Sequence, residues 1–191
     1  MSARERILDA AADVMRERGV AGATTKEIAK AAGYSEALLY KHFRDKEQLM
    51  MSVLKERMPA FAARAVPGEA TVEANLVAVV HGGVAFYRRA FPMMASMAAQ
   101  PVLLAATRAS LRQYGAGPHE PVRALTRYLD TERDLGRVAA GADTAAAAAL
   151  LMGACFQQGF LHYFAAAPDA PDLPESAAAD LVRPLLPALL P

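Results

Sequence analysis

Closely spaced helix caps near the start of this 191-residue chain constrain its fold more than any other feature. Thr24 precedes Glu27 by three residues, a pair in which the threonine hydroxyl accepts from the glutamate amide and the glutamate carboxylate reaches back. Ser35 predicts the start of a second helix, and Asp45 with Gln48 predicts the start of a third. Helix starts this close together leave room only for short helices joined by tight turns.

Glycines mark where the first helices are expected to stop. Apolar residues recur at helical spacing over residues 7–15, and Gly19 predicts a left-handed stop after them. The short helix that follows is expected to end at Gly33, because glycine adopts a positive φ at little cost. The next helix is expected over residues 36–43.

This order of helix, glycine turn and short helix is the pattern of a helix-turn-helix. In that motif the second helix lies in the major groove of DNA while the first crosses the backbone. Ala29 is small where the two helices would cross, and Ile28, Leu39 and Phe43 supply apolar side chains to pack on the first helix. The pattern predicts a three-helix DNA-binding head.

Alanine dominates the rest of the composition, with 44 of the 191 residues, and it is the strongest helix former. The chain has no tryptophan and few runs of β-branched residues. We therefore expect an all-α protein without strands.

Proline and glycine breaks delimit the helices expected beyond the head. The helix from Lys46 is expected to reach about Arg64, with a kink or an early end at Pro59. Pro184 and Pro187 oppose a helix beyond Arg183. The further helices are expected over residues 71–89, 92–114, 118–134, 143–166 and 175–189.

Several classes of protein are disfavoured. The single cysteine, Cys155, excludes an internal disulfide and a cysteine-based metal site, and a buried inert thiol is favoured there over a redox sensor. No metal-ligand spacing, nucleophile elbow or phosphate-cradling glycine loop occurs, so we expect no enzyme, no cofactor and no bound metal. Charged residues are spread through the first 20 positions and leave no apolar stretch for a signal peptide. This argues against export and favours a cytoplasmic protein.

One uncharged segment, residues 144–168, is long enough to cross a bilayer. It carries Gln157, Gln158 and His162, which lipid could not satisfy. A buried or interface helix is therefore favoured over a membrane span.

The head carries three characteristic runs, Thr24-Thr25-Lys26-Glu27-Ile28-Ala29, Ala32-Gly33-Tyr34-Ser35 and Leu39-Tyr40-Lys41-His42-Phe43-Arg44-Asp45-Lys46-Glu47-Gln48-Leu49. From Ile7 to Leu49 the chain resembles the amino-terminal domain of the tetracycline-repressor (TetR/AcrR) family of transcriptional regulators. The remainder resembles the family only in its helical layout and in Leu135-Gly136-Arg137-Val138 ahead of Asp143. The resemblance implies a homodimer that usually represses until a small molecule binds. It also implies a helix-turn-helix DNA-binding domain in residues 1–46 and a helical-bundle ligand-binding and dimerisation domain in residues 47–191.

The resemblance implies two kinds of contact with DNA. Hydroxyl and ammonium groups hold phosphate oxygens without reading sequence, whereas side chains on the groove face of a short helix can specify bases. The implied phosphate contacts are Thr25, Lys26, Tyr40, His42 and Lys46. The base-facing positions are Glu36, Ala37, Leu38 and Lys41, with Ser35 at the cap of the same helix.

Three of these assignments have alternatives. Glu36 stands where many relatives have a neutral or basic residue; it either accepts from a cytosine N4 amine or only supplies an acid to the first helical turn. Leu38 either touches a thymine methyl group or packs inward. Tyr40 either binds phosphate or lies half-buried under the turn.

The resemblance also implies a ligand pocket for a small, largely apolar effector. Methionine and aromatic side chains can line an adaptable cavity, although each of them can equally fill the core. His81, Arg88, Gln158 and His162 are the polar groups expected to orient a ligand, with a satisfied core or interface histidine as the alternative for His162. The expected lining is Phe61, His81, Phe86, Tyr87, Arg88, Met93, Met94, Met97, Tyr128, Met152, Cys155, Phe156, Gln158 and His162.

A seam of mostly small residues, spaced three and four positions apart, runs along the helix expected over residues 143–166. Small residues let helices approach closely, so the seam suits pairing with its copy across a two-fold axis, and intramolecular packing is the alternative. The expected interface is Ala146, Ala149, Gly153, Gln157, Phe160 and Phe164, joined by Leu181, Val182 and Leu185.

We therefore expect a ligand-responsive regulator that binds a palindromic double-stranded DNA operator as a homodimer. A small effector would release it, which makes repression the expected mode. The alternative is a sequence-indifferent architectural DNA-binding protein without ligand gating.

Overall fold

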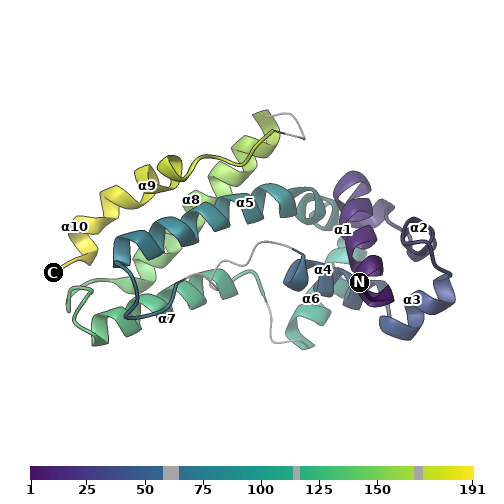
Figure 1. The fold of residues 1–191 in the computed structure, drawn as a ribbon, viewed down its shortest axis with the longest axis horizontal. Coiled ribbons are helices and arrows are strands. Elements are labelled where there is room, and N and C mark those ends of the chain that lie inside the picture. The colour runs from purple at the N-terminus through teal and green to yellow at the C-terminus, as the bar shows by residue number, and fades with distance from the viewer. Residues whose placement is uncertain (58–64, 114–116, 166–169) are drawn as a thin grey trace. The chain divides into compact units, whose positions relative to one another are not determined.

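The computed structural model describes residues 1–57, 65–113, 117–165 and 170–191. All regular structure in these ranges is helical, which confirms the predicted all-α class (Figure 1). The helices are α1 (Ala3–Gly22), α2 (Thr25–Ala31), α3 (Glu36–His42), α4 (Lys46–Glu56), α5 (Val72–Ala98), α6 (Pro101–Gln113), α7 (Glu120–Asp134), α8 (Thr144–Ala165), α9 (Glu175–Val182), the 3₁₀ turn η1 (Arg183–Leu185) and α10 (Leu186–Leu189).

The chain divides into two compact units. The first unit comprises Met1–Met58 and Arg89–Gly117, and the second comprises Pro59–Arg88 and Pro118–Pro191. This division differs from the expected boundary after residue 46, because α4 and the carboxyl-terminal part of α5 belong with the helices of the head.

The first unit is built on one apolar cluster that α1 to α4 share with the end of α5. α1 packs against both α2 and α4. Burying large apolar side chains is the main stabilising term in a domain of this size. The largest of those that are fully buried here are Ile7, Leu8, Met15, Ile28, Leu39, Phe43, Leu49, Met50 and Met93.

The caps predicted for α2 and α3 are both present. The Thr24 hydroxyl accepts from the Glu27 amide at 3.2 Å, and the Glu27 carboxylate accepts from the Thr24 amide at 3.2 Å. The Ser35 hydroxyl accepts from the Leu38 amide at 3.3 Å. These bonds satisfy amides that the first turn of each helix leaves without partners.

α1 is interrupted at Gly19, where a stop was predicted. Gly19 adopts a positive φ of 69° and a ψ of 167°, which are not helical, but one more helical turn follows and α1 ends at Gly22. A side chain from the distant end of α5 supports this turn, since the Ser96 hydroxyl accepts from the Ala21 amide at 3.1 Å. Gly19 therefore makes a kink within α1 rather than its end.

α4 ends early, which is one of the two outcomes predicted for Pro59. It begins at Lys46, with the Asp45 carboxylate accepting from the Gln48 amide at 2.7 Å, and it ends at Glu56 rather than near Arg64. Pro59 has no amide to donate, which disfavours helical bonding just beyond this end. Residues 58–64 lie outside the described residues.

The break predicted at Pro92 is absent, because α5 continues through this proline to Ala98. An interior proline removes one helical hydrogen bond, but the residues beyond it, among them Met93 and Met97, bury their side chains in the core of the first unit. Burial here outweighs the local preference to stop. The chain breaks instead at Pro101, where α6 begins.

The carboxyl-terminal helices extend beyond Arg183 and fill the expected range of 175–189, although Pro184 and Pro187 opposed a helix there. The 3₁₀ turn η1 and α10 carry the helical path to Leu189, and Leu189 is buried in the second unit. Pro184 and Pro187 each occupy one of the first positions of these short helices. A missing amide costs nothing there, because those amides have no intrahelical partner.

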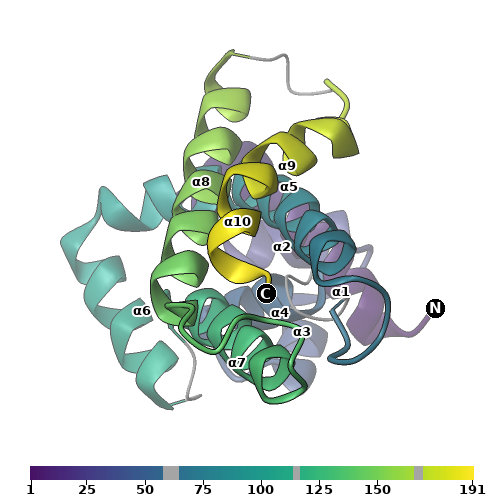
Figure 2. The same ribbon diagram turned by 90° about the vertical axis from the view of Figure 1, so that its left-hand side faces the viewer.

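The second unit packs the first part of α5 with α7, α8, α9 and α10 (Figure 2). α7 and α8 share the largest helix contact of the unit. α5 and α8 cross at Gly159, where an added Cβ would lie 2.7 Å from the Tyr87 Cβ and 2.8 Å from the Arg88 nitrogen. The glycine makes this close crossing possible.

α8 is long and apolar enough to cross a membrane, with a mean hydropathy of 1.3 over its most apolar window. Buried core helices of soluble proteins often share these properties. Its buried residues, from Thr144 to Gly159, face the core of the second unit. This placement agrees with the predicted buried or interface helix.

Candidate nucleic-acid interface

The α2–α3 corner has the geometry of a helix-turn-helix. Gly33 turns the chain with a φ of 77°, and the Tyr34 amide donates to the Ala29 carbonyl at 2.9 Å to close the turn. Ala29 is buried where α2 and α3 meet. Leu39 and Phe43 are buried on one side of α3 and fix it to the head.

The opposite side of α3 is open to solvent. Ala37, Lys41 and His42 are exposed, and Tyr40 exposes 49% of its surface. Leu38 is part-buried, as is Glu36. All ten residues expected to bind DNA lie in the first unit, and none of them is fully buried.

Three of these ten residues are linked by hydrogen bonds. The Thr25 hydroxyl, in the first turn of α2, donates to the Glu36 carboxylate on α3 at 2.5 Å. The Thr25 oxygen also lies 3.2 Å from the Tyr40 hydroxyl. Because threonine has one hydroxyl proton, Tyr40 is the donor in this second contact. Neither sequence interpretation of Glu36 anticipated its bond to Thr25, since the two residues lie on different helices.

The expected cationic phosphate contacts lie at the surface. Lys26 is exposed on α2, and Lys46 is part-buried at the start of α4. Burial lowers the pKa of Lys46, while the charges of Glu47 and Glu27 act to raise it.

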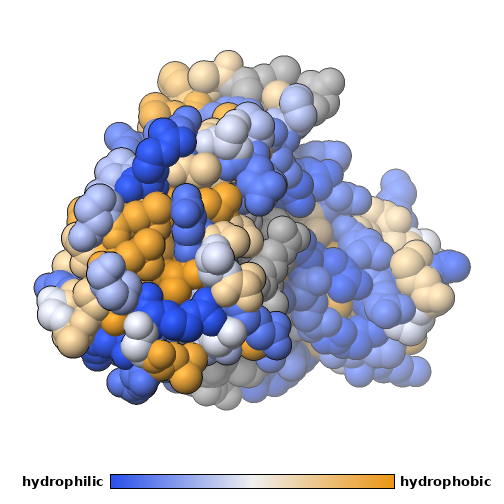
Figure 3. Space-filling view, turned by 60° about the vertical axis from the view of Figure 1, so that its left-hand side comes forward, coloured by the Kyte–Doolittle hydropathy of each residue, from blue (hydrophilic) through white to orange (hydrophobic). Residues whose placement is uncertain are grey.

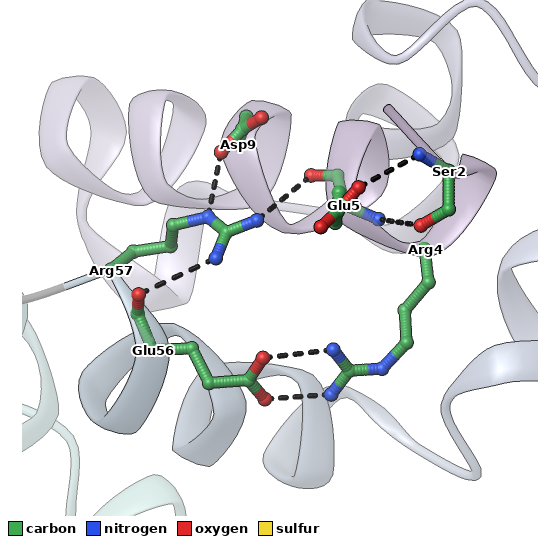
Figure 4. A network of polar contacts seen from close by, with 6 residues as sticks. All are labelled: Ser2, Arg4, Glu5, Asp9, Glu56 and Arg57. Carbon is green, nitrogen blue, oxygen red and sulfur yellow. Dashed lines mark hydrogen bonds and ion pairs between the residues drawn. The ribbon is translucent and has the colours of Figure 1, made fainter.

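A bidentate ion pair joins the start of α1 to the end of α4 (Figure 4). The two Arg4 nitrogens lie 2.8 and 2.6 Å from the Glu56 carboxylate oxygens. The hydrogen bond from Arg4 lowers the pKa of Glu56. The Arg4 guanidinium also lies 5.3 Å from the centre of the Phe43 ring, so it contacts the residue that anchors the end of α3.

Arg57 makes a second link between the same two helices. Its Nε donates to the Asp9 carboxylate at 2.6 Å, and one of its terminal nitrogens donates to the Glu5 carbonyl at 3.4 Å (Figure 4). Both links lie within the first unit, so α4 is attached to α1 at its end as well as through its buried face.

Residues 7–53 match the sequence model of the bacterial regulatory proteins of the tetR family. This chain matches the TetR family over these residues. Its sequence is 34% identical over 77 residues to the fatty acid metabolism regulator protein of Bacillus subtilis, and the match covers 39% of this chain and 40% of that protein. The chain thus matches well under half the length of this relative, and the likeness in sequence does not extend over the whole protein.

Solved structures resemble the whole fold of this chain. A TetR-family regulator from Mesorhizobium loti has a TM-score of 0.72 at 19% identity, over 99% of this chain and 97% of that one. SmeT, the repressor of the Stenotrophomonas maltophilia multidrug efflux pump SmeDEF, has a TM-score of 0.66 at 23% identity, over 100% of this chain and 92% of that one. At these identities the likeness shows the fold.

The residues expected to line a ligand pocket are not all brought together. Phe61 lies outside the described residues. Met93 and Met97 are buried in the core of the first unit, with Met94 packed against it. The clustering of apolar residues along the sequence could not reveal this, because α5 contributes to both units.

The other expected pocket residues lie in the second unit. Tyr128, Met152 and Cys155 are buried in its core. Burial raises the pKa of the Cys155 thiol to about 12, which agrees with the favoured inert thiol. Phe86, Tyr87 and Phe156 form a chain of edge-on ring contacts, with centroids 5.4 and 5.3 Å apart.

A cavity of about 210 Å³ lies in the second unit between α5, α8 and residues 173–181. Two expected ligand-orienting residues, His81 and Gln158, line it. His81 Nε2 also donates to the Leu173 carbonyl at 2.9 Å. The residues of the 173–181 wall were not among the expected lining, and no sequence signal placed them against α5.

The remaining two polar candidates differ in their surroundings. Arg88 forms an ion pair with Asp172 at 2.9 Å and also binds the Ala170 carbonyl, so its charge is compensated within the unit. The Nδ1 atom of His162 is buried and has no hydrogen-bond partner among the residues that the structure describes. The expectation of a satisfied core histidine is therefore not met at this atom.

The seam expected for pairing lies on the solvent side of α8. Ala146, Ala149, Gly153 and Gln157 are exposed, and an added Cβ at Gly153 would meet nothing within 4 Å. Phe164 exposes 79% of its surface. Phe160 is part-buried, as are Leu181 and Leu185. In the space-filling view, hydrophobic residues gather on the second unit among hydrophilic ones (Figure 3).

Val182 is a correction to the expected interface. It is fully buried within the second unit's own core, so its side chain has no surface to offer a second copy. Its spacing from Leu181 and Leu185 in the sequence did not distinguish the inner face of α9 from the outer one.

Proposed function

We propose that this chain is a transcriptional regulator that reads an operator in double-stranded DNA with α3. The observation that carries the proposal is the solvent-exposed side of α3, with Lys41 and His42, opposite the buried anchors Leu39 and Phe43. A short helix held in this way can place side chains on base edges while neighbouring hydroxyl and ammonium groups contact phosphates. The proposal gives the chain no catalytic role and no cofactor, and it implies a cytoplasmic location.

We further propose that the chain acts as a homodimer paired through α8. Exposed apolar side chains on this helix support the pairing, among them Leu150, Leu161 and Phe164. In water such a surface gains stability by meeting its own copy across a two-fold axis. Two related heads would read half-sites about 34–36 Å apart, so the operator is expected to be nearly palindromic.

The proposed mode of action is repression relieved by a small, largely apolar effector. The cavity between α5, α8 and residues 173–181 is the candidate effector site, because apolar groups form most of its lining and His81 and Gln158 add polar ones. Its size suits only a small molecule unless neighbouring side chains move. SmeT, which this chain resembles in fold, is named a repressor, and this supports the same mode here.

Selection of duplexes from a random-sequence pool at physiological salt tests the proposal. A regulator enriches one near-palindromic site, and effector candidates can then be screened for release of that site. An architectural protein, the alternative function, would enrich no preferred sequence.

Two substitutions test the division of contacts. Tyr40→Phe and Lys46→Ala are expected to weaken binding to every duplex by a similar factor, and Lys46→Ala lowers the slope of log affinity against log salt by about one unit. Lys41→Ala is expected to change which bases are preferred. A uniform loss from Lys41→Ala over all operator variants would contradict its place at the base edges.

A further inference from the structure

The contact between Thr25 and Glu36 has a consequence for how DNA is bound. Both residues belong to the proposed DNA-facing surface, and their side chains bind each other at 2.5 Å. Thr25 in turn accepts from Tyr40 at 3.2 Å, so the protons run from Tyr40 to Thr25 and from Thr25 to Glu36. We call this set of three residues the hydroxyl chain.

Phosphate oxygens accept hydrogen bonds and cannot donate them. Thr25 and Tyr40 must therefore donate their protons to bind phosphate, and each has only one hydroxyl proton. In the hydroxyl chain both protons are already used. Thr25 cannot bind a phosphate until the carboxylate of Glu36 releases it, whereas Tyr40 has only to give up its bond to Thr25.

Release of Thr25 leaves Glu36 with an unsatisfied carboxylate next to a polyanion. The carboxylate needs a new donor, and a base amine in the major groove is one: the N4 amine of cytosine or the N6 amine of adenine. Glu36 lies in the first turn of α3, and the side of α3 opposite Leu39 and Phe43 is exposed to solvent. The Glu36 side chain is therefore placed to turn from Thr25 towards the groove.

We propose that Glu36 is a specificity-determining residue that withholds the Thr25 hydroxyl from phosphate unless the groove offers it a base amine. This inference rests on the proposed DNA-binding function. It couples a phosphate contact, which carries no sequence information, to a base contact, which does. Binding to the wrong sequence is weakened because the phosphate contact of Thr25 is then lost as well.

Glu36→Ala removes the acceptor and frees the Thr25 hydroxyl. We expect this variant to bind a scrambled duplex about tenfold more tightly, the gain from about one charge-assisted hydrogen bond. Its ratio of affinities for the selected and scrambled duplexes is expected to fall by a similar factor or more. Random-pool selection with the variant is expected to lose one base preference in each half-site.

Glu36→Gln separates the hydrogen bond from the charge. Glutamine still accepts from Thr25 through its amide oxygen but carries no charge, so it is expected to give a smaller gain on the scrambled duplex than alanine does. A full gain from glutamine would show that Glu36 acts only by repelling phosphate, and the proposal would be overturned. Glu17→Ala, on the exposed surface of α1, is the control for the change in net charge.

A double-mutant cycle gives the decisive comparison. In a Thr25→Val, Tyr40→Phe background there are no hydroxyls to release, so Glu36→Ala is expected to change affinity for the scrambled duplex by less than about threefold, against about tenfold in the unaltered chain. An equal gain in both backgrounds would overturn the proposal. Thermal unfolding of each variant establishes that the head is folded.

The outcomes separate this inference from the function on which it rests. If the unaltered chain selects no duplex, the proposed function fails and the inference fails with it. If the unaltered chain selects a near-palindromic duplex while Glu36→Ala leaves both affinity and base preference unchanged, only the role of Glu36 is refuted.

Discussion

Arg4 and Glu56 lie 52 residues apart in the sequence and close a two-pronged ion pair between the first turn of α1 and the last turn of α4. The pair leaves the end of α4 attached to the head just before the chain enters residues 58–64, which precede α5. Any signal that reaches the head through α4 must act against this attachment and against the buried face of α4.

The Arg4–Glu56 pair is expected to contribute modestly to stability. Both side chains are partly exposed, at 40% and 33%, so water screens their attraction. A double-mutant cycle with Arg4→Ala and Glu56→Ala, followed by urea unfolding, is expected to give a coupling energy of about 0.5–1 kcal/mol. The contact of Arg4 with Phe43 does not enter this coupling energy, because it is lost in Arg4→Ala and in the double variant alike. A coupling indistinguishable from zero would show that the bidentate geometry adds nothing.

The same pair makes stability depend on pH. The hydrogen bond from Arg4 lowers the pKa of Glu56 in the folded state, so the carboxylate binds protons less readily there than in the unfolded chain. Its stabilising contribution is therefore present above the unfolded pKa of about 4.3 and is lost as pH falls through the lower folded value. The difference in unfolding free energy between the unaltered chain and Glu56→Gln should be constant near neutrality and shrink below that pH. A difference that grows on acidification would have the wrong sign.

Gly19 and Gly33 provide a matched pair of glycines in the first unit. Both have positive φ, 69° and 77°, but a Cβ at Gly19 would lie 2.7 Å from the Cβ of Ser96, whereas at Gly33 it would meet nothing within 4 Å. Gly33→Ala should cost about 1 kcal/mol for backbone strain alone. Gly19→Ala should cost at least about 1 kcal/mol more, because Ser96 must move and because the ψ of 167° at Gly19 adds backbone strain for any other residue. Equal losses in urea unfolding would mean that the kink in α1 adjusts freely.

Gly159 is expected to tolerate no side chain. Its Cβ would approach backbone atoms of α5, the Arg88 nitrogen at 2.8 Å and the Val84 oxygen at 3.0 Å, and these cannot move without shifting the helix. Gly159→Ala should destabilise the chain by about 1–3 kcal/mol despite the better helix propensity of alanine. Gly141→Ala, in open space within the same unit, is the control. A gain in stability at position 159 would refute the close crossing of α5 and α8.

The parts of the fold that could be predicted from the sequence depend on neighbours along the chain. The caps at Thr24, Ser35 and Asp45 bind amides three residues away, so short sequence patterns identify them. The continuation of α1 past Gly19 depends on Ser96, 75 residues beyond Ala21, and no local pattern records that contact. The break predicted at Pro92 was wrong for the same reason. The residues beyond this proline are buried against helices that are distant in the sequence, and this burial keeps α5 helical.

The candidate site shows the same limit. The residues proposed to face DNA follow from their order in one short motif, and none of them is fully buried. The expected pocket mixed residues from both units, since Met93 and His81 lie on one helix but pack into different cores. The bond of Glu36 to Thr25 joins two helices, which neither of the interpretations of Glu36 from its own helix considered.

Chemical interference on the selected duplex tests the central claim, that α3 enters the major groove. Methylation of guanine N7 marks the major groove, and methylation of adenine N3 marks the minor groove. The account predicts that N7 methylation blocks binding in two patches about one helical turn apart. Interference confined to adenine N3, or to a single patch, would contradict it.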